Sequence, residues 1–237
     1  MNKTVAIIPA RGGSKRIPKK NIIDFMGKPM IYWTIKAAMD SKVFDRIILT
    51  TDSEEIAQVG RDCGLDVPFL RQNKNDDISP VSEATIEAIK QAEEYYKESY
   101  DTVIQLMANA PLRKGHEIKE HYQSFTENKR DFQLSSFKFG WMNPWWAAKL
   151  KEDNSPEWMF PEGITKRSQD LDDLYCPTGV IWIADVEKLK GSNTFYGPNY
   201  KFCEINWKSA VDIDDYEDLE FAKALFLLET NNGEKKI

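Results

Sequence analysis

Short β-branched runs alternate with amphipathic segments through the first half of the chain, and this alternation limits the possible folds more than any other feature of the sequence. The runs expected to be strands cover residues 3–9, 46–53 and 102–107, and the segments expected to be helices cover residues 29–41, 54–63 and 82–96. Strands that alternate with helices build βαβ units, a parallel sheet and right-handed crossovers. The sequence therefore predicts an α/β fold.

A strongly basic loop follows the first expected strand. The stretch AIIPARGGSKRIPKKN at 6–21 holds five cations in a chain of net charge −6: Arg11, Lys15, Arg16, Lys19 and Lys20. Like charges this close repel one another, and a loop offers no apolar burial in return. Because ligands of parallel sheets bind beyond the carboxyl ends of the strands, we expect this loop to bind an anionic group. A solvated basic loop without a ligand is the alternative.

The loop matches neither of the two common phosphate-binding motifs. It lacks the second glycine of G-x-x-x-x-G-K-[ST], and G-x-G-x-x-G is also absent. A general mechanism remains, in which Gly12 and Gly13 let backbone N–H groups approach a phosphate while Arg11, Lys15 and Lys20 neutralise its charge.

Length and composition exclude several classes of protein. The 237 residues suit one domain with an insertion, and 32 basic against 38 acidic residues argue against nucleic-acid binding, which uses a basic face. No apolar run approaches the roughly 18 residues of a membrane span, and no signal peptide precedes the first strand, so a cytoplasmic location is expected. Three cysteines without C-x-x-C spacing predict buried thiols rather than a zinc site or disulfides.

Residues 132–170 interrupt the alternation of strands and helices. This segment contains four of the seven tryptophans, a turn signal at Asn143-Pro144 and a polar loop with prolines. Because a strand-rich aromatic segment is poorly suited to a crossover helix, we expect an arm that leaves the main sheet of a single domain, residues 1–237. Exposed aromatic surface is typical of protein interfaces, which makes the arm a candidate dimer contact.

The chain is expected to return to the sheet after the arm. Strands are predicted at 179–185 and, at a sheet edge, at 202–207, and a closing helix at 216–228. An earlier polar helix carries His116 and His121, which lack partners at metal-ligand spacing and are expected on the surface.

Two carboxylates precede the closing helix in the stretch VDIDDYEDLE. On a strand, Asp212 and Asp214 would share one face and would repel unless a cation lay between them. Mg²⁺ suits this position, because it takes carboxylate and phosphate oxygens together. An acidic helix N-terminus capped by Asp214 or Asp215 is the alternative, and Asp215 keeps that interpretation.

Motifs along nearly the whole chain resemble those of the acylneuraminate (CMP-nonulosonate) cytidylyltransferases. In chain order they are PARGGSKRIPKKNI, GKPMIYWTI, FDRIILTTDSEEIA, PFLR, PLR, RSQD, PTG and SAVDIDDYEDLE. The resemblance implies a Rossmann-like three-layer α/β/α sandwich with a mostly parallel sheet, usually dimeric, whose arm reaches into the partner subunit. It also implies that a sugar hydroxyl attacks the α-phosphate of CTP, so that pyrophosphate leaves and a CMP-sugar forms.

The resemblance also assigns roles to individual residues. It places Arg11 and Lys20 on the phosphates and Asp212 and Asp214 on Mg²⁺, and these four form the expected catalytic set. The expected nucleotide-binding residues are Arg11, Gly12, Gly13, Ser14, Lys15, Lys20, Asn21, Arg71, Ser79 and Ser82. Arg71 matches the family arginine near cytosine, whereas Ser82 taken alone also fits a helix N-cap. The expected sugar-binding residues are Met107, Asn109, Arg167, Gln169, Thr178, Trp182, Phe195 and Tyr196.

Some of these sugar-side residues also fit ordinary structural roles. Trp182, Phe195 and Tyr196 would be unremarkable as core aromatics, and Arg167 as a surface arginine.

The sugar side departs from the common family pattern. Met107 stands where many relatives carry the glutamine of Q-P-T-S-P-L-R, and Cys176 stands where they carry the arginine of R-P-N-G. A thioether cannot make the hydrogen bonds of an amide, so a less polar pocket is expected, suited to a nonulosonate with deoxygenated or acylamido carbons. The runs FGWMNPWWAAKL and MANAPLR look most like the legionaminic-acid branch of the family.

The sequence therefore predicts an Mg²⁺-dependent homodimeric enzyme that makes a CMP-nonulosonate from CTP. Two alternatives remain: another sugar nucleotidyltransferase, such as a ketodeoxyoctulosonate or sugar-1-phosphate enzyme, and a non-catalytic regulator that binds CTP.

Overall fold

The computed structural model describes residues 2–71 and 81–234, with side chains through residue 230. A six-stranded sheet of order β10-β6-β9-β5-β1-β4 forms its centre. The strands are β1 (Thr4–Pro9), β4 (Arg46–Thr50), β5 (Thr102–Gln105), β6 (Phe132–Lys138), β9 (Tyr175–Asp185) and β10 (Lys201–Glu204). Five of them run in one direction, and β9 runs antiparallel between β5 and β6. The sheet is therefore mostly parallel, and β10 lies at an edge as the sequence indicated.

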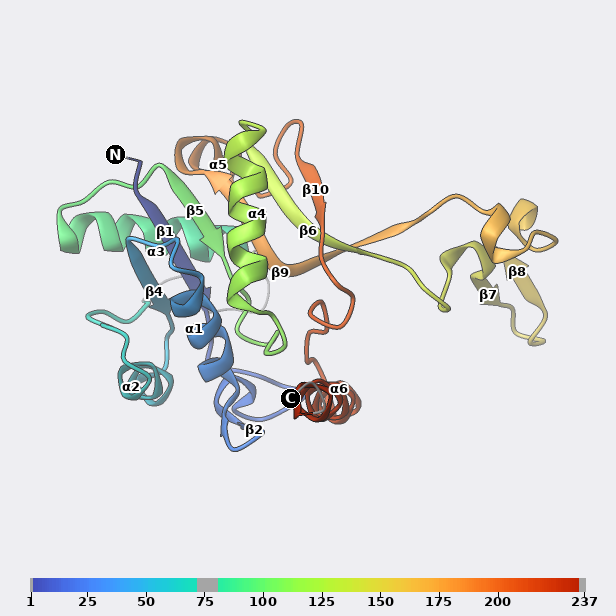
Figure 1. Cartoon of the computed structure of the whole chain (residues 1–237), viewed down its shortest axis with the longest axis horizontal. Coiled ribbons are helices and arrows are strands. Elements are labelled where there is room, and N and C mark those ends of the chain that lie inside the picture. Colours follow the sequence, from blue (N-terminus) through green and yellow to red (C-terminus); the bar gives the residue numbers. More distant parts are fainter. Residues whose placement is uncertain (1, 72–80, 235–237) are drawn as a thin grey trace.

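Helices cover both faces of this sheet (Figure 1). They are α1 (Met30–Ser41), α2 (Glu54–Asp62), α3 (Val81–Tyr96), α4 (Gly115–Glu127), α5 (Val186–Ser192) and α6 (Tyr216–Glu234). Alternate side chains of β1 separate the two layers: Ala6 and Ile8 pack with α1, α2 and α4, whereas Val5 and Ile7 pack with α3 and α5. This arrangement confirms the expected three-layer α/β/α sandwich.

A smaller apolar cluster fixes the end of the basic loop against α6. Ile17 of the loop and Phe25 of β2 (Asp24–Phe25) pack there with Ile213 and with the buried side of α6. β2 pairs with β3 (Lys28–Pro29), and the one-turn helix η1 (Lys20–Ile22) precedes this hairpin. Packing of Ile17 against Ile213 therefore brings two segments that are distant in the sequence, the basic loop and the carboxylates near residue 214, to one place.

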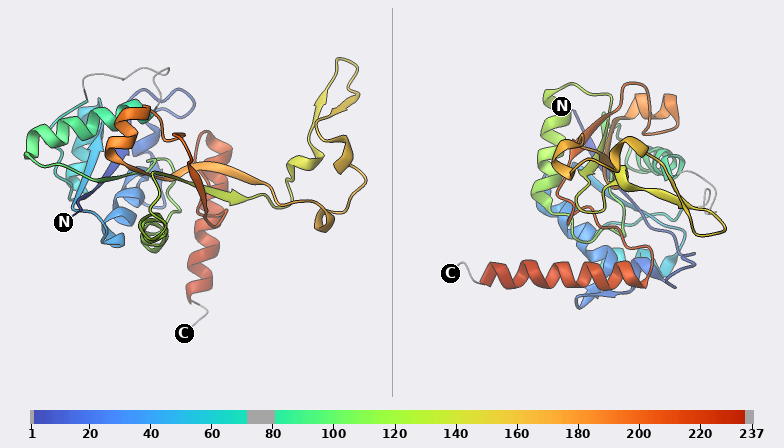
Figure 2. Two further views of the ribbon diagram at one scale, coloured as in Figure 1. Left: turned by 90° about the horizontal axis from the view of Figure 1, so that it is seen from above. Right: turned by 90° about the vertical axis from the view of Figure 1, so that its right-hand side faces the viewer.

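The arm, residues 139–174, projects far from the body of the molecule (Figure 2). It contains η2 (Pro144–Trp146), β7 (Ala148–Leu150), β8 (Pro156–Trp158), η3 (Pro161–Gly163) and η4 (Ser168–Asp170). Trp141 is 84% exposed and Leu150 70% exposed, so the arm presents a large apolar surface.

The arm begins later than the sequence indicated. Residues 132–138 form β6, which pairs with β9 and β10 and is buried over its first five residues. The sequence placed this run in the arm because no helix separates it from the aromatic segment that follows.

Two expectations about burial were wrong. His121 is only 4% exposed, because α4 packs it toward the sheet, whereas His116 is exposed. The cysteines Cys63, Cys176 and Cys203 are unpaired thiols, as expected, but each is half-buried rather than fully buried.

Candidate active site

A cavity of about 460 Å³ lies beyond the carboxyl ends of β1 and β5. Pro9 ends β1 and Asn109 follows β5, and both line it. The other described residues that line it are Arg11, Ser14, Lys15, Arg16, Lys20, Asn21, Arg71, Val81, Ala84, Met107, Ala108 and Asp214. The cavity therefore lies where ligands of parallel sheets bind, and the basic loop forms one wall.

Hydrogen bonds from the protein fix the shape of the basic loop. The Gly12 amide donates to Oδ1 of Asp52 at 2.8 Å, and Nδ2 of the buried Asn21 donates to the Arg11 carbonyl at 2.9 Å. A Cβ on Gly12 would lie 3.1 Å from Cβ of Ser53, so this position favours glycine. Because its amide is already bonded to Asp52, Gly12 shapes the loop rather than offering an N–H group to a phosphate as the sequence suggested.

Most of the loop cations line the cavity, and one pairs with a carboxylate on α2 instead. Arg11, Lys15, Arg16 and Lys20 line the cavity. Lys19 instead pairs with Glu55 on α2, with Nζ 2.7 Å from Oε1. Thus four of the five loop cations gather around the cavity, which agrees with the expectation of an anionic ligand. Gly13, by contrast, is not among the residues that line it.

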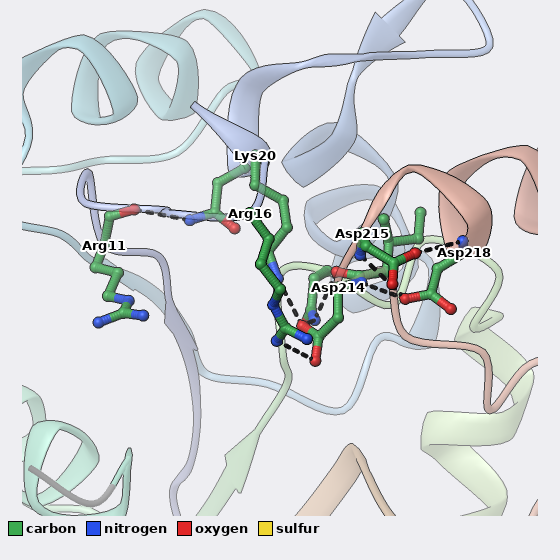
Figure 3. A network of polar contacts seen from close by, with 9 residues as sticks. Arg11, Arg16, Lys20, Asp214, Asp215 and Asp218 are labelled. Atoms are coloured by element: carbon green, nitrogen blue, oxygen red, sulfur yellow. Dashed lines mark hydrogen bonds and ion pairs between the residues drawn. The ribbon is translucent and has the colours of Figure 1, made fainter. Parts of the chain in front are cut away.

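Asp214 holds two of these cations together (Figure 3). Nζ of Lys20 donates to Oδ1 at 2.8 Å, and an Arg16 guanidinium nitrogen lies 2.6 Å from Oδ2. Partial burial opposes ionisation of this carboxyl, but the hydrogen bonds and charges of Lys20 and Arg16 outweigh it and lower the pKa of Asp214. The side chain of Arg11 lies apart from this group in the same view.

Asp212 lies close to Asp214 but has the opposite electrostatic surroundings. Desolvation and the negative charge of Asp214 raise the pKa of Asp212. Residues 205–215 are irregular, so the two carboxylates do not share a strand face as the sequence suggested. They nevertheless lie near enough to repel, and two carboxylates together with substrate phosphates fit the way proteins hold Mg²⁺.

Asp215 caps the closing helix. Its Oδ1 accepts from the Asp218 amide at 3.0 Å, while Oδ2 of Asp218 accepts from the amides of Asp214 and Asp215 at 2.9 and 3.1 Å (Figure 3). This reciprocal cap fixes the backbone of Asp214 where α6 begins. The capping interpretation of Asp215 is therefore confirmed.

Arg71 also lines the cavity. It is 5% exposed, and its backbone amide donates to the Thr51 carbonyl at 2.7 Å. Burial lowers the pKa of Arg71, and the charge of Arg11 lowers it further while Asp52 opposes the change. Such a buried, oriented guanidinium suits recognition of a polar group at the end of the cavity.

Of the two serines assigned to the nucleotide, Ser82 lies within the described residues and Ser79 does not. Ser82 is buried in the first turn of α3 and is not among the residues that line the cavity, although its neighbour Val81 is. Ser79 lies outside the described residues.

Met107 and Asn109 follow β5 and both line the cavity. Nδ2 of Asn109 donates to the Ile213 carbonyl at 3.1 Å and lies 3.5 Å from Oδ1 of Asp214, which ties β5 to the carboxylate segment. A Cβ at Gly179 of β9 would lie 2.9 Å from Cγ of Met107, so the glycine leaves room for this side chain. The structure thus brings these two predicted sugar residues to the cavity that the loop cations line.

The aromatic residues assigned to the sugar form a cluster and are not among the residues that line this cavity. Trp182 contacts Phe195 and Tyr196, with ring centroids 5.4 and 5.7 Å apart. Phe195 is fully buried in the core with α3 and α5, so its assignment to substrate contact was wrong, and the core alternative holds. Thr178 is also buried and donates to the Ala210 carbonyl at 3.4 Å. Tyr196 is 45% exposed.

The two arm residues assigned to the sugar lie far from the cavity of their own chain. Arg167 is exposed and pairs with Asp170, with Nε 2.7 Å from Oδ2, and Gln169 belongs to η4 in the arm. Figure 2 shows that the arm, which contains both residues, projects away from the body of the molecule. The structure therefore does not bring these predicted residues together with the rest within one chain.

Arg16 is the residue that the sequence analysis left without a role. It was noted as one of the five loop cations, but the pattern did not tell it apart from the exposed Lys19. The distinction comes from contact with Asp214, which lies almost 200 residues away in the sequence. The ion pair between Arg16 and Asp214 sets Arg16 apart, and this pair can be recognised only in the three-dimensional structure.

Comparisons with known proteins identify the family of the chain. Residues 5–176 match the family model described as "Cytidylyltransferase". The chain is 37% identical over 226 residues to a pseudaminic acid cytidylyltransferase of Campylobacter jejuni, covering 94% of this chain and 96% of that protein. It is 29% identical to an N-acylneuraminate cytidylyltransferase of Streptococcus agalactiae, covering 91% of this chain and 51% of that longer protein.

A solved structure shows that the fold is shared. A CMP:2-keto-3-deoxy-manno-octonic acid synthetase complexed with CTP superposes with a TM-score of 0.70, covering 96% of this chain and all of that chain at 17% identity. The family model spans well over half of the sequence, and its match begins at β1, which carries the basic loop. The chain is therefore a member of the cytidylyltransferase family, with relatives that are named for nonulosonic acids.

Proposed function

We propose that this protein transfers CMP from CTP to the anomeric hydroxyl of a nine-carbon sugar acid and releases pyrophosphate. The observation that carries this proposal is the cavity beside β1, which four loop cations and Arg71 line together with Asp214. A cavity with this excess of positive charge suits a triphosphate, and the family membership identifies the reaction class. The sugar hydroxyl is the nucleophile, so no covalent enzyme intermediate is needed.

The loop cations act on the charge that develops during transfer. Lys20 is only 15% exposed and is held by Asp214, so it points into the cavity before substrate arrives. As the bond between the α-phosphate and pyrophosphate breaks, negative charge grows on the leaving oxygens. A fixed cation aimed at this charge stabilises the transition state by about 3 kcal/mol in a site with little water.

Magnesium is proposed at Asp212 and Asp214. Desolvation raises the pKa of Asp212, and the negative charge of Asp214 raises it further; a divalent cation would relieve this repulsion. When bound, Mg²⁺ would neutralise phosphate charge and orient the triphosphate. Asp212 and Asp214 would hold Mg²⁺ together with the substrate phosphates, whose charge Lys20 and Arg16 at the same carboxylate would also contact.

The sugar is proposed to be a nonulosonate with deoxygenated and acylamido carbons. Met107 supports this, since its thioether lines the cavity and gives hydroxyl groups no strong hydrogen bond. Two relatives at 37% and 36% identity are named for pseudaminic acid, which makes it the first candidate. Legionaminic acid is the second candidate, favoured by the likeness of the runs FGWMNPWWAAKL and MANAPLR to that branch.

A homodimer is proposed, in which the arm of one subunit serves the other. The exposed aromatic surface of the arm supports an interface. Arg167 offers a planar fork suited to a carboxylate, but it lies far from its own cavity. No helix in the described ranges 2–71 and 81–234 has the length and apolarity to cross a membrane. Since CTP is a cytoplasmic metabolite, we propose that the enzyme works in the cytoplasm.

The reaction is tested by pyrophosphate release with CTP and Mg²⁺, comparing pseudaminic, legionaminic and N-acetylneuraminic acids under identical conditions. We expect turnover with a diacetamido sugar and little with N-acetylneuraminic acid. The variant Met107→Gln should shift kcat/KM toward N-acetylneuraminic acid by about tenfold, the worth of one hydrogen bond. A panel of other nucleoside triphosphates and of ketodeoxyoctulosonate separates this function from other sugar nucleotidyltransferases. Nucleotide binding without turnover on any sugar would instead support a regulator.

A further inference from the structure

The short turn after β4 holds the backbone of two segments that line the cavity. The Thr51 carbonyl accepts from the Arg71 amide at 2.7 Å. Oδ1 of Asp52, the next residue in the turn, accepts from the Gly12 amide at 2.8 Å. Arg71 lines the cavity, and so does Arg11, the residue before Gly12. One turn therefore contacts the backbone beside two cations of the cavity, and Asp52 is its charged side chain.

The bond from Gly12 to Asp52 fixes one end of the peptide group that joins Arg11 to Gly12. The other end of the same peptide group is the Arg11 carbonyl, which accepts from Nδ2 of the buried Asn21 at 2.9 Å. Because a peptide group is planar, two bonds at opposite ends fix its orientation. That orientation sets the direction in which the Arg11 side chain leaves the backbone.

Asp52 belongs to a firmly held part of the fold. Ser53, the next residue, is the N-cap of α2: its Oγ accepts from the Ile56 amide at 3.4 Å, and its carbonyl accepts from the Ala57 amide at 2.9 Å. The Ser53 amide donates to Oγ1 of Thr51 at 3.1 Å, and Thr51 is fully buried. The Asp52 carboxylate is therefore placed by the fold itself, before any ligand binds.

A second contact between α2 and the basic loop is the weaker of the two. Nζ of Lys19 lies 2.7 Å from Oε1 of Glu55, but both side chains are more than half exposed. Exposed ion pairs contribute little because water and salt screen them. A hydrogen bond to an ionised acceptor is shorter and stronger than one between neutral groups. Of the two contacts, the bond from Gly12 to Asp52 is therefore the one that holds the loop.

The negative charge of Asp52 is unfavourable for an anionic ligand if charge alone is considered. It lies against a loop of cations, where it reduces their attraction for phosphate. Asp52 is also not among the described residues that line the cavity, so it does not contact the ligand there. Charge alone therefore predicts that removal of Asp52 tightens CTP binding, whereas a role in holding the loop predicts weaker binding.

We propose that Asp52 is a positioning residue for CTP, which holds the Arg11–Gly12 peptide group against Asn21 and so directs Arg11 at the phosphates before CTP arrives. The inference rests on the proposed function, because it takes CTP as the ligand of the cavity. A loop that is already in place does not have to be ordered when the ligand binds, and this strengthens binding.

The first test examines the loop without any nucleotide. Hydrogen–deuterium exchange of peptides that cover residues 10–20 reports how well the amides of the loop are protected. Asp52→Ala should raise exchange at Gly12 by about tenfold or more, because it removes the acceptor of that amide. Asp52→Asn keeps an acceptor oxygen and should stay within about threefold of the parent protein. Equal exchange in the parent and in Asp52→Ala would overturn the proposal.

The second test is isothermal titration with CTP. Asp52→Ala should raise the Kd about tenfold, and Asp52→Asn should largely restore it, because the acceptor and not the charge holds the loop. Asp62→Ala is the matched control, since it removes an exposed carboxylate near the other end of α2 that accepts from Gln58. Its Kd should change less than twofold. Tighter or unchanged binding in Asp52→Ala would overturn the proposal.

Each variant is first checked for an unchanged thermal transition. If Asp52→Ala does not fold, Gly12→Ala disturbs the same contact from the side of the loop, because its Cβ would lie 3.1 Å from Cβ of Ser53. Gly12→Ala should then raise both the exchange of the loop and the Kd, and a parental Kd in this variant would overturn the proposal. A parent protein that binds no CTP would contradict the proposed function, while the exchange rates would still decide whether Asp52 holds the loop.

Discussion

Nζ of Lys20 lies 2.8 Å from Oδ1 of Asp214, so a cation of the loop after β1 is paired with a carboxylate that precedes the last helix. The pair joins the two ends of the sequence at the rim of one cavity. It also orients a mostly buried lysine at the cavity. Arg16 shares the same carboxylate at 2.6 Å, so one anion holds two cations in place.

Removal of Lys20 should impair the chemical step. Lys20→Ala is expected to lower kcat at saturating CTP by about tenfold or more, because a cation that stabilises the transition state acts on turnover. The measurement is pyrophosphate release over a range of CTP concentrations. Lys19→Ala is the matched control: Lys19 is the next residue but pairs with Glu55 at the surface, and its loss should change kcat less than twofold. An unchanged kcat in Lys20→Ala would remove Lys20 from the mechanism.

Substitutions of the neighbouring residues Asp212 and Asp215 should have different effects, the first on turnover and the second on stability. Asp212→Ala is expected to abolish turnover and leave CTP binding detectable, since the proposed metal position is lost while the loop cations remain. Asp215→Ala is expected to keep turnover but to lower the free energy of unfolding by about 1 kcal/mol, because it removes the N-cap of α6. Isothermal titration with CTP and urea denaturation give these quantities. Full activity in Asp212→Ala would exclude the proposed metal role.

The acid stability of the fold should depend on Glu98, which lies outside the active site. Arg46 donates to both of its oxygens, at 2.7 and 3.1 Å, and Tyr100 donates at 3.0 Å. The hydrogen bonds from Arg46 and Tyr100 lower the pKa of Glu98 to about 2 from an ordinary value near 4.5. A lowered pKa means that the folded state favours the ionised form. This contribution to stability is therefore complete above about pH 4.5 and is lost as the pH falls toward 2.

Urea midpoints measured from pH 7 to pH 3 test this expectation. The parent protein should lose stability below pH 4.5 more steeply than Glu98→Gln, which has no carboxyl to titrate at this position. Parallel curves for the two proteins would show that Glu98 makes no such contribution.

The sequence predicted the features that depend on residues close to one another in the chain. The position of the basic loop after a β-branched strand located the cavity, and the alternation of elements gave the layers of the sandwich. Local patterns failed where burial depends on distant segments. His121 looks like a surface residue of a polar helix, but α4 packs against β6 and β9, which come later in the sequence. Phe195 matched a family position but lies in the core, because α3 and α5 close over it.

The limits of the arm show the same dependence on distant partners. β6 is followed directly by aromatic residues, and no local signal separates the two. Only its pairing with β9 and β10, which follow the arm in the sequence, makes residues 132–138 part of the sheet. Likewise, Arg16 and Lys19 are both cations of the same basic loop, and the sequence alone does not distinguish them. They differ because one meets Asp214 and the other meets Glu55.

The arm should act in the partner subunit. Arg167→Ala is expected to raise the KM for the sugar acid at least tenfold, since its fork would bind the carboxylate. Mixing Arg167→Ala with Lys20→Ala, after mild denaturation and refolding to exchange subunits, should restore about one quarter of the parent activity. Half of the dimers would then be mixed, and one of their two sites would be intact.

Two observations control this complementation experiment. At sugar concentrations well below KM, each variant taken through the same exchange alone should keep its own reduced activity, and light scattering should report a dimer for both. Trp141→Glu, in the exposed surface of the arm, should weaken the dimer and prevent recovery, because a charge in an apolar interface opposes association. If mixed dimers form without recovered activity, Arg167 does not serve the site of its partner. Recovery would place the arginine, 147 residues after Lys20 in the sequence, in the same working site by way of a second chain.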